Sequence, residues 1–360
     1  MAGAQAAERA LNARAPSGSG GVHMDRKRVC MLHVGGTVGM APAEEGFRTR
    51  PGHLGEELNR MEVLQRPELP QVDLVEYEEL LDSADMMPED WQRIADDVVQ
   101  RITDYDGFVI LHGTDTMAYT ASALSFMLEN LDRPVVLTGS QIPLCEIRSD
   151  AASNLVDAIT VAGMAEIPEV MIQFGGKLLR GNRSVKISAD GFQAFDSPNF
   201  PPLGRTGVRI RLNRRRARPM PEAPLRLCPM GTTPVASLRL FPGIDVRVLR
   251  PFLESPLEGL VLEAYGVGNG PRRNRDIIKA IGDATAAGLV VVVVSQCLEA
   301  NVHLTEYATG AALADAGCVG GGDLTAEAAM TKLLHLFGRG ISIDEVRRLM
   351  SVDLRGELTA

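Results

Sequence analysis

The sequence predicts an α/β fold of two domains: a larger N-terminal domain with a mostly parallel, doubly wound sheet, and a smaller C-terminal α/β domain. Short apolar runs without alternation recur along the chain, and such runs are typical of strands buried on both faces of a parallel sheet. Stretches with helical spacing separate them, as in successive βαβ units. The length of 360 residues also exceeds the size at which one hydrophobic core stops growing.

The first half of the chain supplies the elements of the larger domain. The pattern predicts strands at 29–34, 72–77, 108–111, 134–138 and 170–174. It predicts helices at 88–105, from 117 onward and at 154–165. The apolar face expected for the second helix consists of Met117, Ala121, Leu124, Leu128 and Leu131. Residues 41–60 show no sustained period, so we expect a loop, suited to a flap, that leads into a short helix.

A polar segment separates the two domains. Residues 214–224 contain four arginines and three prolines, which is typical of a solvated linker. The chain beyond it predicts strands at 235–240, 259–264 and 289–295 and helices at 273–287, 325–337 and 343–350. We therefore expect an N-terminal domain at 24–212, a linker at 213–234 and a C-terminal domain at 235–360.

The start of the chain predicts no folded element. Residues 1–23 are rich in Ala, Gly, Ser and Arg and predict a disordered extension, with Met24 as an alternative start. They lack an apolar segment of signal-peptide length, so we expect a cytoplasmic protein. Arg9 and Arg14 beside the single acid Glu8 leave an organelle-transit peptide as the alternative. No stretch approaches the roughly 20 apolar residues of a membrane span, so we expect no membrane partner.

Composition argues against several classes of function. A formal net charge of -9 disfavours a nucleic-acid partner, because such a partner requires clustered Lys and Arg. The five cysteines are scattered and lack C-x-x-C spacing, which indicates reduced thiols. The six histidines show no metal-ligand spacing. We therefore expect an acidic enzyme that uses neither a metal nor a cofactor.

Two strand ends carry the residues that point to chemistry. The apolar run 108–111 is followed by His-Gly-Thr-Asp-Thr at 112–116, so a hydroxyl and a carboxylate lie at the carboxyl end of a strand and above a helix N-terminus. This position favours an anionic group of a ligand. A helix cap alone would explain Thr-Asp-Thr equally well. The same arrangement recurs after the first strand, where two glycines precede Thr37.

The paired threonine motifs resemble those of the L-asparaginases, amidohydrolases that use threonine as nucleophile. Residues 112–117, His-Gly-Thr-Asp-Thr-Met, match the second family motif in full, and residues 35–39, Gly-Gly-Thr-Val-Gly, match the first. Further stretches are similar to the cytoplasmic, type I bacterial branch: 81–86, 137–143, 180–186, 264–269 and 354–359. The resemblance extends from about residue 24 to the end of the chain. It implies hydrolysis of L-asparagine to L-aspartate and ammonia.

The resemblance also implies the catalytic roles. Thr37 is the implied nucleophile, which forms an acyl-enzyme, releases ammonia and is freed by hydrolysis. Thr114, Asp115 and Lys186 are implied as a triad. A lysine serves as a base only where burial or nearby positive charge lowers its pKa, and a carboxylate partner positions it while opposing that shift. Without the family context, Lys186 would be an exposed, salt-bridging lysine. The sequence leaves open which threonine attacks first.

Contacts with the substrate head group follow from the same resemblance. Ser83, with the backbone of Asp82 and Ala84, is similar to the stretch that holds the substrate α-carboxylate. Asp115, next to Thr114, is similar to the residue that pairs with the α-amino group. For Ser83 and Asp115 the alternative is a turn residue that bonds its own backbone.

Two further site features depend on backbone and assembly. The N–H groups that follow Gly36 and Gly113 are the expected oxyanion donors. Asn269 is implied to reach the site of a neighbouring subunit, since the resemblance implies a homo-oligomer, a tetramer built from dimers. The sequence does not itself decide between dimer and tetramer.

Two positions depart from the family pattern. Val34 stands where most members have a further threonine, and Phe47 falls at the flap tyrosine that assists the first threonine. We expect slower acylation with the Thr114 triad intact.

These departures keep open a non-catalytic amino-acid sensor of the same fold. A tRNA-dependent amidotransferase subunit is a further alternative, although such subunits carry an additional N-terminal domain. Preference for asparagine over glutamine is expected within the leading interpretation.

Overall fold

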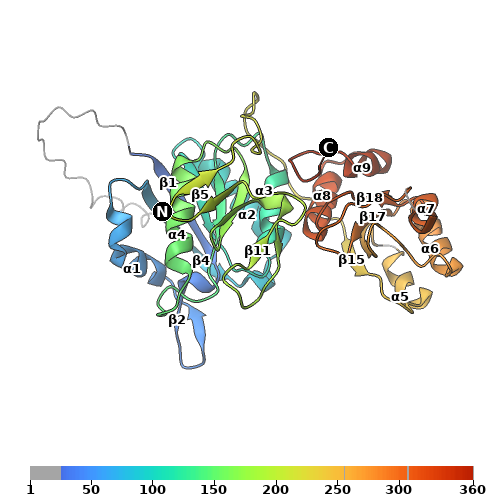
Figure 1. Ribbon diagram of the computed structural model, residues 1–360, viewed down its shortest axis with the longest axis horizontal. Coiled ribbons are helices and arrows are strands. Elements are labelled where there is room, and N and C mark those ends of the chain that lie inside the picture. Colours follow the sequence, from blue (N-terminus) through green and yellow to red (C-terminus); the bar gives the residue numbers. More distant parts are fainter. Residues whose placement is uncertain (1–25, 255, 306–307, 360) are drawn as a thin grey trace, which may run out of the picture.

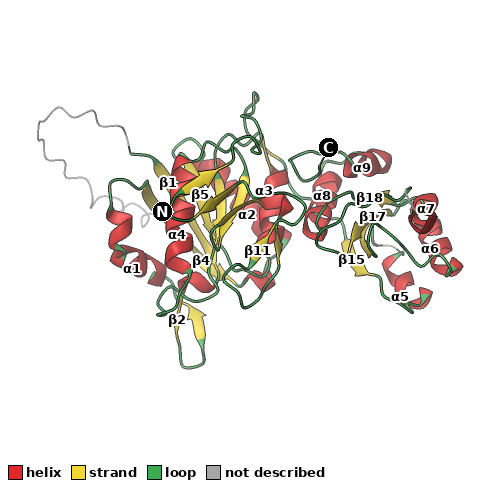
Figure 2. Cartoon of the chain, in the orientation of Figure 1, coloured by secondary structure: helices red, strands yellow, loops and turns green. Residues whose placement is uncertain are grey.

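The computed structural model describes residues 26–254, 256–305 and 308–359, so the predicted extension at 1–23 lies outside the described residues. It forms two α/β domains that lie side by side along the long axis of the molecule (Figure 1). An eight-stranded sheet has the order β13-β12-β9-β8-β7-β5-β1-β4, and a four-stranded sheet in the smaller domain has the order β15-β16-β17-β18. Helices flank both sheets (Figure 2). The predicted fold class is confirmed.

The larger sheet has a parallel part and an antiparallel edge. Its parallel strands are β4 (Gln71–Leu81), β1 (Arg28–Gly35), β5 (Gly107–Leu111), β7 (Val135–Thr138) and β8 (Val170–Phe174). The antiparallel edge, which the sequence did not predict, consists of β9 (Lys177–Arg180), β12 (Gly204–Thr206) and β13 (Ile210–Leu212). Because β4 and β5 flank β1 on opposite sides, the winding reverses between β1 and β5. Open α/β sheets bind ligands at the carboxyl edge of such a switch point.

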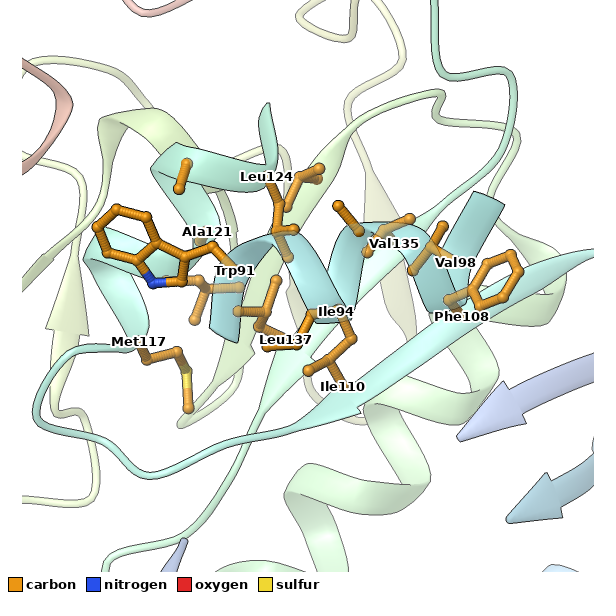
Figure 3. Close-up of a cluster of buried hydrophobic side chains, with 14 of the residues drawn as sticks. Trp91, Ile94, Val98, Phe108, Ile110, Met117, Ala121, Leu124, Val135 and Leu137 are labelled. Carbon is orange, nitrogen blue, oxygen red and sulfur yellow. The ribbon is translucent and has the colours of Figure 1, made fainter. Parts of the chain in front are cut away.

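Two helical layers cover the parallel strands. Helices α2 (Pro88–Arg101) and α3 (Met117–Met127) pack on one face, and α1 (His53–Arg60) and α4 (Ala151–Met164) pack on the other. Figure 3 shows the first layer, in which Trp91, Ile94 and Val98 of α2 lie near the apolar side chains of β5 and β7. The buried side chains of both layers place the parallel strands at the centre of the domain.

Helix α3 differs from its predicted form. It ends at Met127, so Leu128 and Leu131 are buried beyond the helix rather than on its apolar face. Thr120 and Ser122 are buried as well, so the helix is enclosed on nearly all sides. The cause is α8 (Ala326–Gly338) of the smaller domain, which packs against α3. The prediction of one apolar face was therefore wrong, because a partner distant in sequence covers the other side.

The smaller domain is a parallel sheet with helices on both faces. Its strands are β15 (Val235–Arg239), β16 (Gly259–Ala264), β17 (Val290–Ser295) and β18 (Val319–Gly320). Its other helices are α5 (Val246–Leu249), η5 (Arg250–Phe252), α6 (Arg275–Ala286), α7 (Ala308–Asp315) and α9 (Ile343–Met350). No helix in the described ranges is long and apolar enough to span a membrane.

Short elements shape the edge of the larger domain. They are η1 (Thr37–Gly39), β2 (Met40–Pro42), β3 (Phe47–Thr49), η2 (Glu62–Gln65), η3 (Ser83–Asp85), β6 (Leu128–Glu129), η4 (Gly181–Arg183), β10 (Val185–Lys186), β11 (Phe195–Asp196) and β14 (Arg226–Leu227). Strands β2 and β3 form a hairpin within the segment predicted to be a loop, closed by a hydrogen bond from Ala43 N to the Gly46 carbonyl. The hairpin projects from the body of the domain in Figure 1.

The segment between the domains is less solvated than its composition suggested. Strand β14 pairs with β6, and Leu225 and Leu227 pack against the core of the larger domain. The carbonyl of Arg216 accepts a hydrogen bond from Arg180 at 2.8 Å. The segment is thus attached to the larger domain.

Candidate active site

Three strand ends meet at the carboxyl edge of the larger sheet. A Cβ atom added to Gly36, which has φ +89, would lie 2.4 Å from the backbone nitrogen of Gly113. One added to Gly113 would lie 2.4 Å from the hydroxyl of Ser83. Only glycine permits these approaches. The segments that carry Thr37, Thr114 and Ser83 therefore lie against one another.

Thr37 begins the short helix η1 directly after β1. It is half-buried, between the buried residues Gly36 and Val38. Among the described residues, no side chain or backbone group forms a hydrogen bond with its hydroxyl. The Thr37 and Thr114 N–H groups likewise find no acceptor in the described ranges, so both are available to a ligand oxygen.

Thr114 has a basic partner already in place. Lys186 Nζ lies 2.7 Å from Thr114 Oγ1 and 2.7 Å from Asp115 Oδ1. Thr114 is buried, the Lys186 side chain is 18% exposed, and the Asp115 side chain is 66% exposed. The structure thus brings the three predicted triad residues together. Because Asp115 faces solvent, its ion pair orients the lysine more than it stabilises the fold.

Gln141 adds a contact that the sequence did not single out. Its side-chain nitrogen donates to the Gly191 carbonyl at 3.2 Å, which directs its oxygen toward Thr114 Oγ1, 3.5 Å away. Its backbone N–H donates to the carboxylate of Asp150. Gln141 follows β7, and its position at the end of a parallel strand next to β5 is the signal that could have identified it.

The predicted carboxylate-binding stretch forms a tight turn at the end of β4. The carboxylate of Asp82 accepts the N–H of Ala84 at 3.0 Å, and the carbonyl of Ser83 accepts the hydroxyl of Thr116 at 2.6 Å. Ser83 is buried against Gly113, whereas Asp82 and Ala84 are exposed. Asp82 therefore caps its own turn, and Ser83 faces the second threonine motif.

A buried polar chain lies behind the Thr114 motif. The Trp91 indole N–H donates to Thr120 Oγ1 at 3.1 Å, and Thr120 Oγ1 lies 2.9 Å from His112 Nε2. His112 Nδ1 lies 2.7 Å from the Gly113 carbonyl, which can only accept, so Nδ1 carries the proton and Thr120 donates to Nε2. Burial lowers the pKa of His112 to about 4. A neutral imidazole therefore holds the peptide that precedes Thr114.

Long-range contacts hold the segment that carries Lys186. Arg183 is buried, pairs with Asp323 at 2.7 Å and donates to the Gly356 carbonyl at 2.8 Å. Asn182 donates to the Arg355 carbonyl at 3.1 Å. The C-terminal segment of the chain thus fixes the short helix that immediately precedes Lys186.

Two predicted residues lie apart from this cluster. Asn269 belongs to the smaller domain, where it follows β16 and its backbone pairs with that of Tyr265. Phe47 lies on the β2–β3 hairpin and is 42% exposed. In the described part of the chain, no group of three or more His, Cys, Asp or Glu side chains is arranged to hold a metal ion. The site offers hydroxyls, an amine and backbone donors, which suit acyl transfer.

Two protein-family models match the chain. The model described as "Asparaginase, N-terminal" matches residues 28–218. The model described as "Glutaminase/Asparaginase C-terminal domain" matches residues 234–350. Together they extend over both domains of the structure.

Individual proteins are similar over nearly the same extent. The chain is 48% identical over 336 residues to L-asparaginase 1 of Escherichia coli K12, covering 93% of this chain and 99% of that protein. Among solved structures, L-asparaginase I from Vibrio cholerae has a TM-score of 0.87 and 44% identity, covering 93% of this chain and 100% of that chain. The thermostable L-asparaginase from Thermococcus kodakarensis has a TM-score of 0.83 and 34% identity, covering 92% and 99%.

Proposed function

Because the chain belongs to the asparaginase family, we propose that it hydrolyses L-asparagine to L-aspartate and ammonia. The observation that carries this proposal is the lysine amine within 2.7 Å of both a threonine hydroxyl and a carboxylate. A threonine hydroxyl is a weak nucleophile until a neighbouring base accepts its proton. We assign that role to Lys186, whose amine Asp115 keeps directed at Thr114.

The reaction runs in two stages on two threonines. In the first, the Thr37 hydroxyl attacks the side-chain amide carbon and gives up its proton, the C–N bond breaks, and the nitrogen takes up that proton and leaves as ammonia. In the second, water attacks the resulting ester; Thr114 and Lys186 accept a proton from the water and return one to the Thr37 oxygen as the ester bond breaks. The N–H groups of Thr37 and Thr114 stabilise the oxyanion in both stages, each worth about 10² to 10³ in rate.

The same edge of the sheet holds the amino-acid head group. The turn at Asp82, Ser83 and Ala84 receives the α-carboxylate, and Asp115 pairs with the α-amino group. Support comes from the contact between Gly113 and Ser83, which joins this turn to the second threonine motif. Asn269 completes the site of a neighbouring subunit in a homo-oligomer, a dimer or a tetramer.

Three further features belong to this proposal. The enzyme acts in the cytoplasm, in keeping with five cysteines that form no disulfide. It requires no metal and no cofactor. The segment 213–234 divides an N-terminal domain at 24–212 from a C-terminal domain at 235–360, in keeping with the family-model matches at 28–218 and 234–350.

Ammonia release from asparagine and from glutamine, measured side by side, tests the proposal. Thr37→Ala and Thr114→Ala are the controls: the first is expected to abolish ammonia release from asparagine, and the second to lower it strongly. Binding of asparagine without ammonia would instead identify a non-catalytic sensor. A preference for glutamine that appears only with charged tRNA would identify an amidotransferase subunit.

The order of attack is tested by trapping the acyl-enzyme. Acid quenching followed by peptide mass spectrometry is expected to find the acyl group on Thr37. Thr114→Ala is expected to slow its formation without moving it. An acyl group on Thr114 would reverse the assignment of the two threonines.

A further inference from the structure

A cavity lies on the side of the larger sheet opposite to Thr114, where the parallel strands begin. Its volume is about 460 Å³, and it is lined by the end of α3, the start of β8 and the segment 218–223. Strand β8 begins at Val170, so the cavity opens at the amino end of the parallel strands. The proposed hydrolysis uses the carboxyl ends of these strands and leaves this cavity without a role.

Three arginines line the cavity, and two of them form ion pairs with carboxylates. Arg180 forms two hydrogen bonds with the carboxylate of Glu169, and both side chains are buried. Arg355 pairs with Glu129. Glu169 therefore compensates the charge of Arg180, whereas Glu129 also pairs with Arg226 and compensates the charge of Arg355 only in part.

Arg218 is the exception. Its backbone N–H donates to Glu169 Oε1 at 2.7 Å, but its guanidinium forms no hydrogen bond or ion pair with any residue in the described ranges. The side chain is half-buried, and burial, followed by the charge of Arg355, lowers the pKa of Arg218, although the carboxylates of Glu169 and Asp353 oppose this shift. A cation that is removed from water and placed beside like charge is destabilised unless an anion joins it.

Glu169 and Asp353 act on Arg218 through their charge, but neither forms an ion pair with its guanidinium. Glu169 is occupied by Arg180, and Glu222 is exposed at the rim of the cavity. The remaining wall is largely apolar, formed by side chains such as Leu128, Leu131 and Met220. A ligand that fits both parts carries an oxyanion for the guanidinium fork and a short apolar body for the wall.

We propose that the cavity around Arg218 binds a small organic oxyanion, a carboxylate or a phosphate ester. The planar guanidinium of Arg218 takes the oxyanion in a bidentate manner, and Arg355, which shares its carboxylate with Arg226, adds positive potential. This site is separate from the proposed active site. Arg180 ends β9 and precedes Lys186 by six residues, so the site lies close in sequence to the segment that positions the catalytic amine.

Calorimetric and thermal-shift titrations of the full chain at constant ionic strength test the proposal, with benzoate and phenyl phosphate as probes. Saturable binding is expected with at least one probe, and the tighter probe identifies the oxyanion class. Arg218→Met is expected to weaken binding by about tenfold or more, because a charge-assisted bidentate contact is lost. Arg215→Met removes an exposed guanidinium from the same segment and is the matched control, expected to bind as the unmodified protein does.

Two further readouts separate a ligand site from a structural role. Glu222→Gln removes the rim carboxylate and is expected to tighten binding. Without a probe, Arg218→Met is expected to keep or raise the melting temperature, because it removes an unpaired charge. A marked fall in the melting temperature, or probe affinity equal to that of the unmodified protein, would overturn the proposal. The first outcome would mean that the Arg218 side chain has a structural role instead.

Discussion

The two threonine segments differ in how firmly the protein holds them. Thr114 lies between Lys186 and Gln141, with a buried polar chain behind it and the Ser83 turn beside it. Thr37 has no hydrogen-bonding partner for its hydroxyl among the described residues, and it leads into a hairpin that exposes Phe47. The Thr114 hydroxyl is thus prearranged with its base. The Thr37 hydroxyl gains a partner only when a substrate binds or the hairpin moves.

This contrast separates two kinds of catalytic contribution. Preorganised groups act without rearrangement during the reaction, and their loss lowers the rate directly. A hydroxyl on a less constrained segment depends on closure around the substrate. Substitutions near Thr114 are therefore expected to lower kcat directly. Substitutions in the hairpin are expected to change how the Thr37 hydroxyl reaches the substrate.

Removal of the amine at Lys186 is expected to have the largest effect. Lys186→Met keeps the aliphatic stem but leaves Thr114 without its base, so kcat is expected to fall by about 10² to 10⁴. The melting temperature should change little, because the Asp115 partner is exposed. Lys177→Met removes another lysine, whose amine lies 2.9 Å from Asp196, and is the matched control. Equal losses of activity in both variants would show that Lys186 acts only as an ion-pair partner.

Contact between the two threonine segments can be broken at Gly36. In Gly36→Ala the new methyl group would meet the backbone of Gly113, which would separate the segments. A displacement of this kind is expected to lower kcat by about 10². Gly46→Ala is the control, because Gly46 also has positive φ (+72) but nothing within 4 Å of an added Cβ. An equal fall in kcat in the two variants would show that backbone strain at positive φ, rather than the contact with Gly113, lowers the activity.

The sequence predicted the elements whose signals are local. The strand Gly259–Ala264 and the helix Ile343–Met350 have the predicted bounds, because apolar runs and caps lie within each segment. The β2–β3 hairpin was missed, although the positive φ of Gly46 suits its turn. The burial of α3 depends on α8, some two hundred residues later, and no pattern within α3 could reveal that contact.

The same limit applies to the site. Family motifs identified Thr114, Asp115 and Lys186, and the structure brings them together. Gln141 was missed because its role depends on the neighbouring strand β5. The hydrogen bond from Arg183 to the Gly356 carbonyl joins residues more than 170 positions apart. Sequence reasoning therefore found the proposed reacting groups and Asp115, which orients Lys186, but missed Gln141 and the long-range contacts of Arg183.

The polar chain behind Thr114 allows a more selective test of how the Thr114 segment is held, with a smaller expected effect on kcat. Thr120→Val leaves the Trp91 N–H and His112 Nε2 without partners in a buried site, which is expected to lower the free energy of unfolding by about 2 kcal/mol. We expect kcat to fall by about tenfold or less, because the Gly113 peptide loses its support.

Ser122→Ala on the same helix is the control for this variant. Ser122 Oγ is buried and has no partner among the described residues, so its removal is expected to keep or raise stability. Urea unfolding and steady-state kinetics measure both quantities. If Thr120→Val were as stable and active as Ser122→Ala, the chain from Trp91 to Gly113 would have no positioning role.

The smallest expected effect concerns the less constrained segment. Phe47→Tyr adds a hydroxyl at the position that matches the flap tyrosine of the family, and Phe47 is exposed enough to accept it without repacking. A new hydrogen bond near Thr37 during acylation would raise kcat by roughly 2- to 10-fold. Phe241→Tyr, at an exposed position of the smaller domain, is the control and should leave kcat unchanged. Because the Thr114 contacts are already complete, a gain would assign the limiting step to the Thr37 side. An unchanged rate would place that step with the prearranged triad, and would remove the missing hydroxyl as a cause of slow acylation.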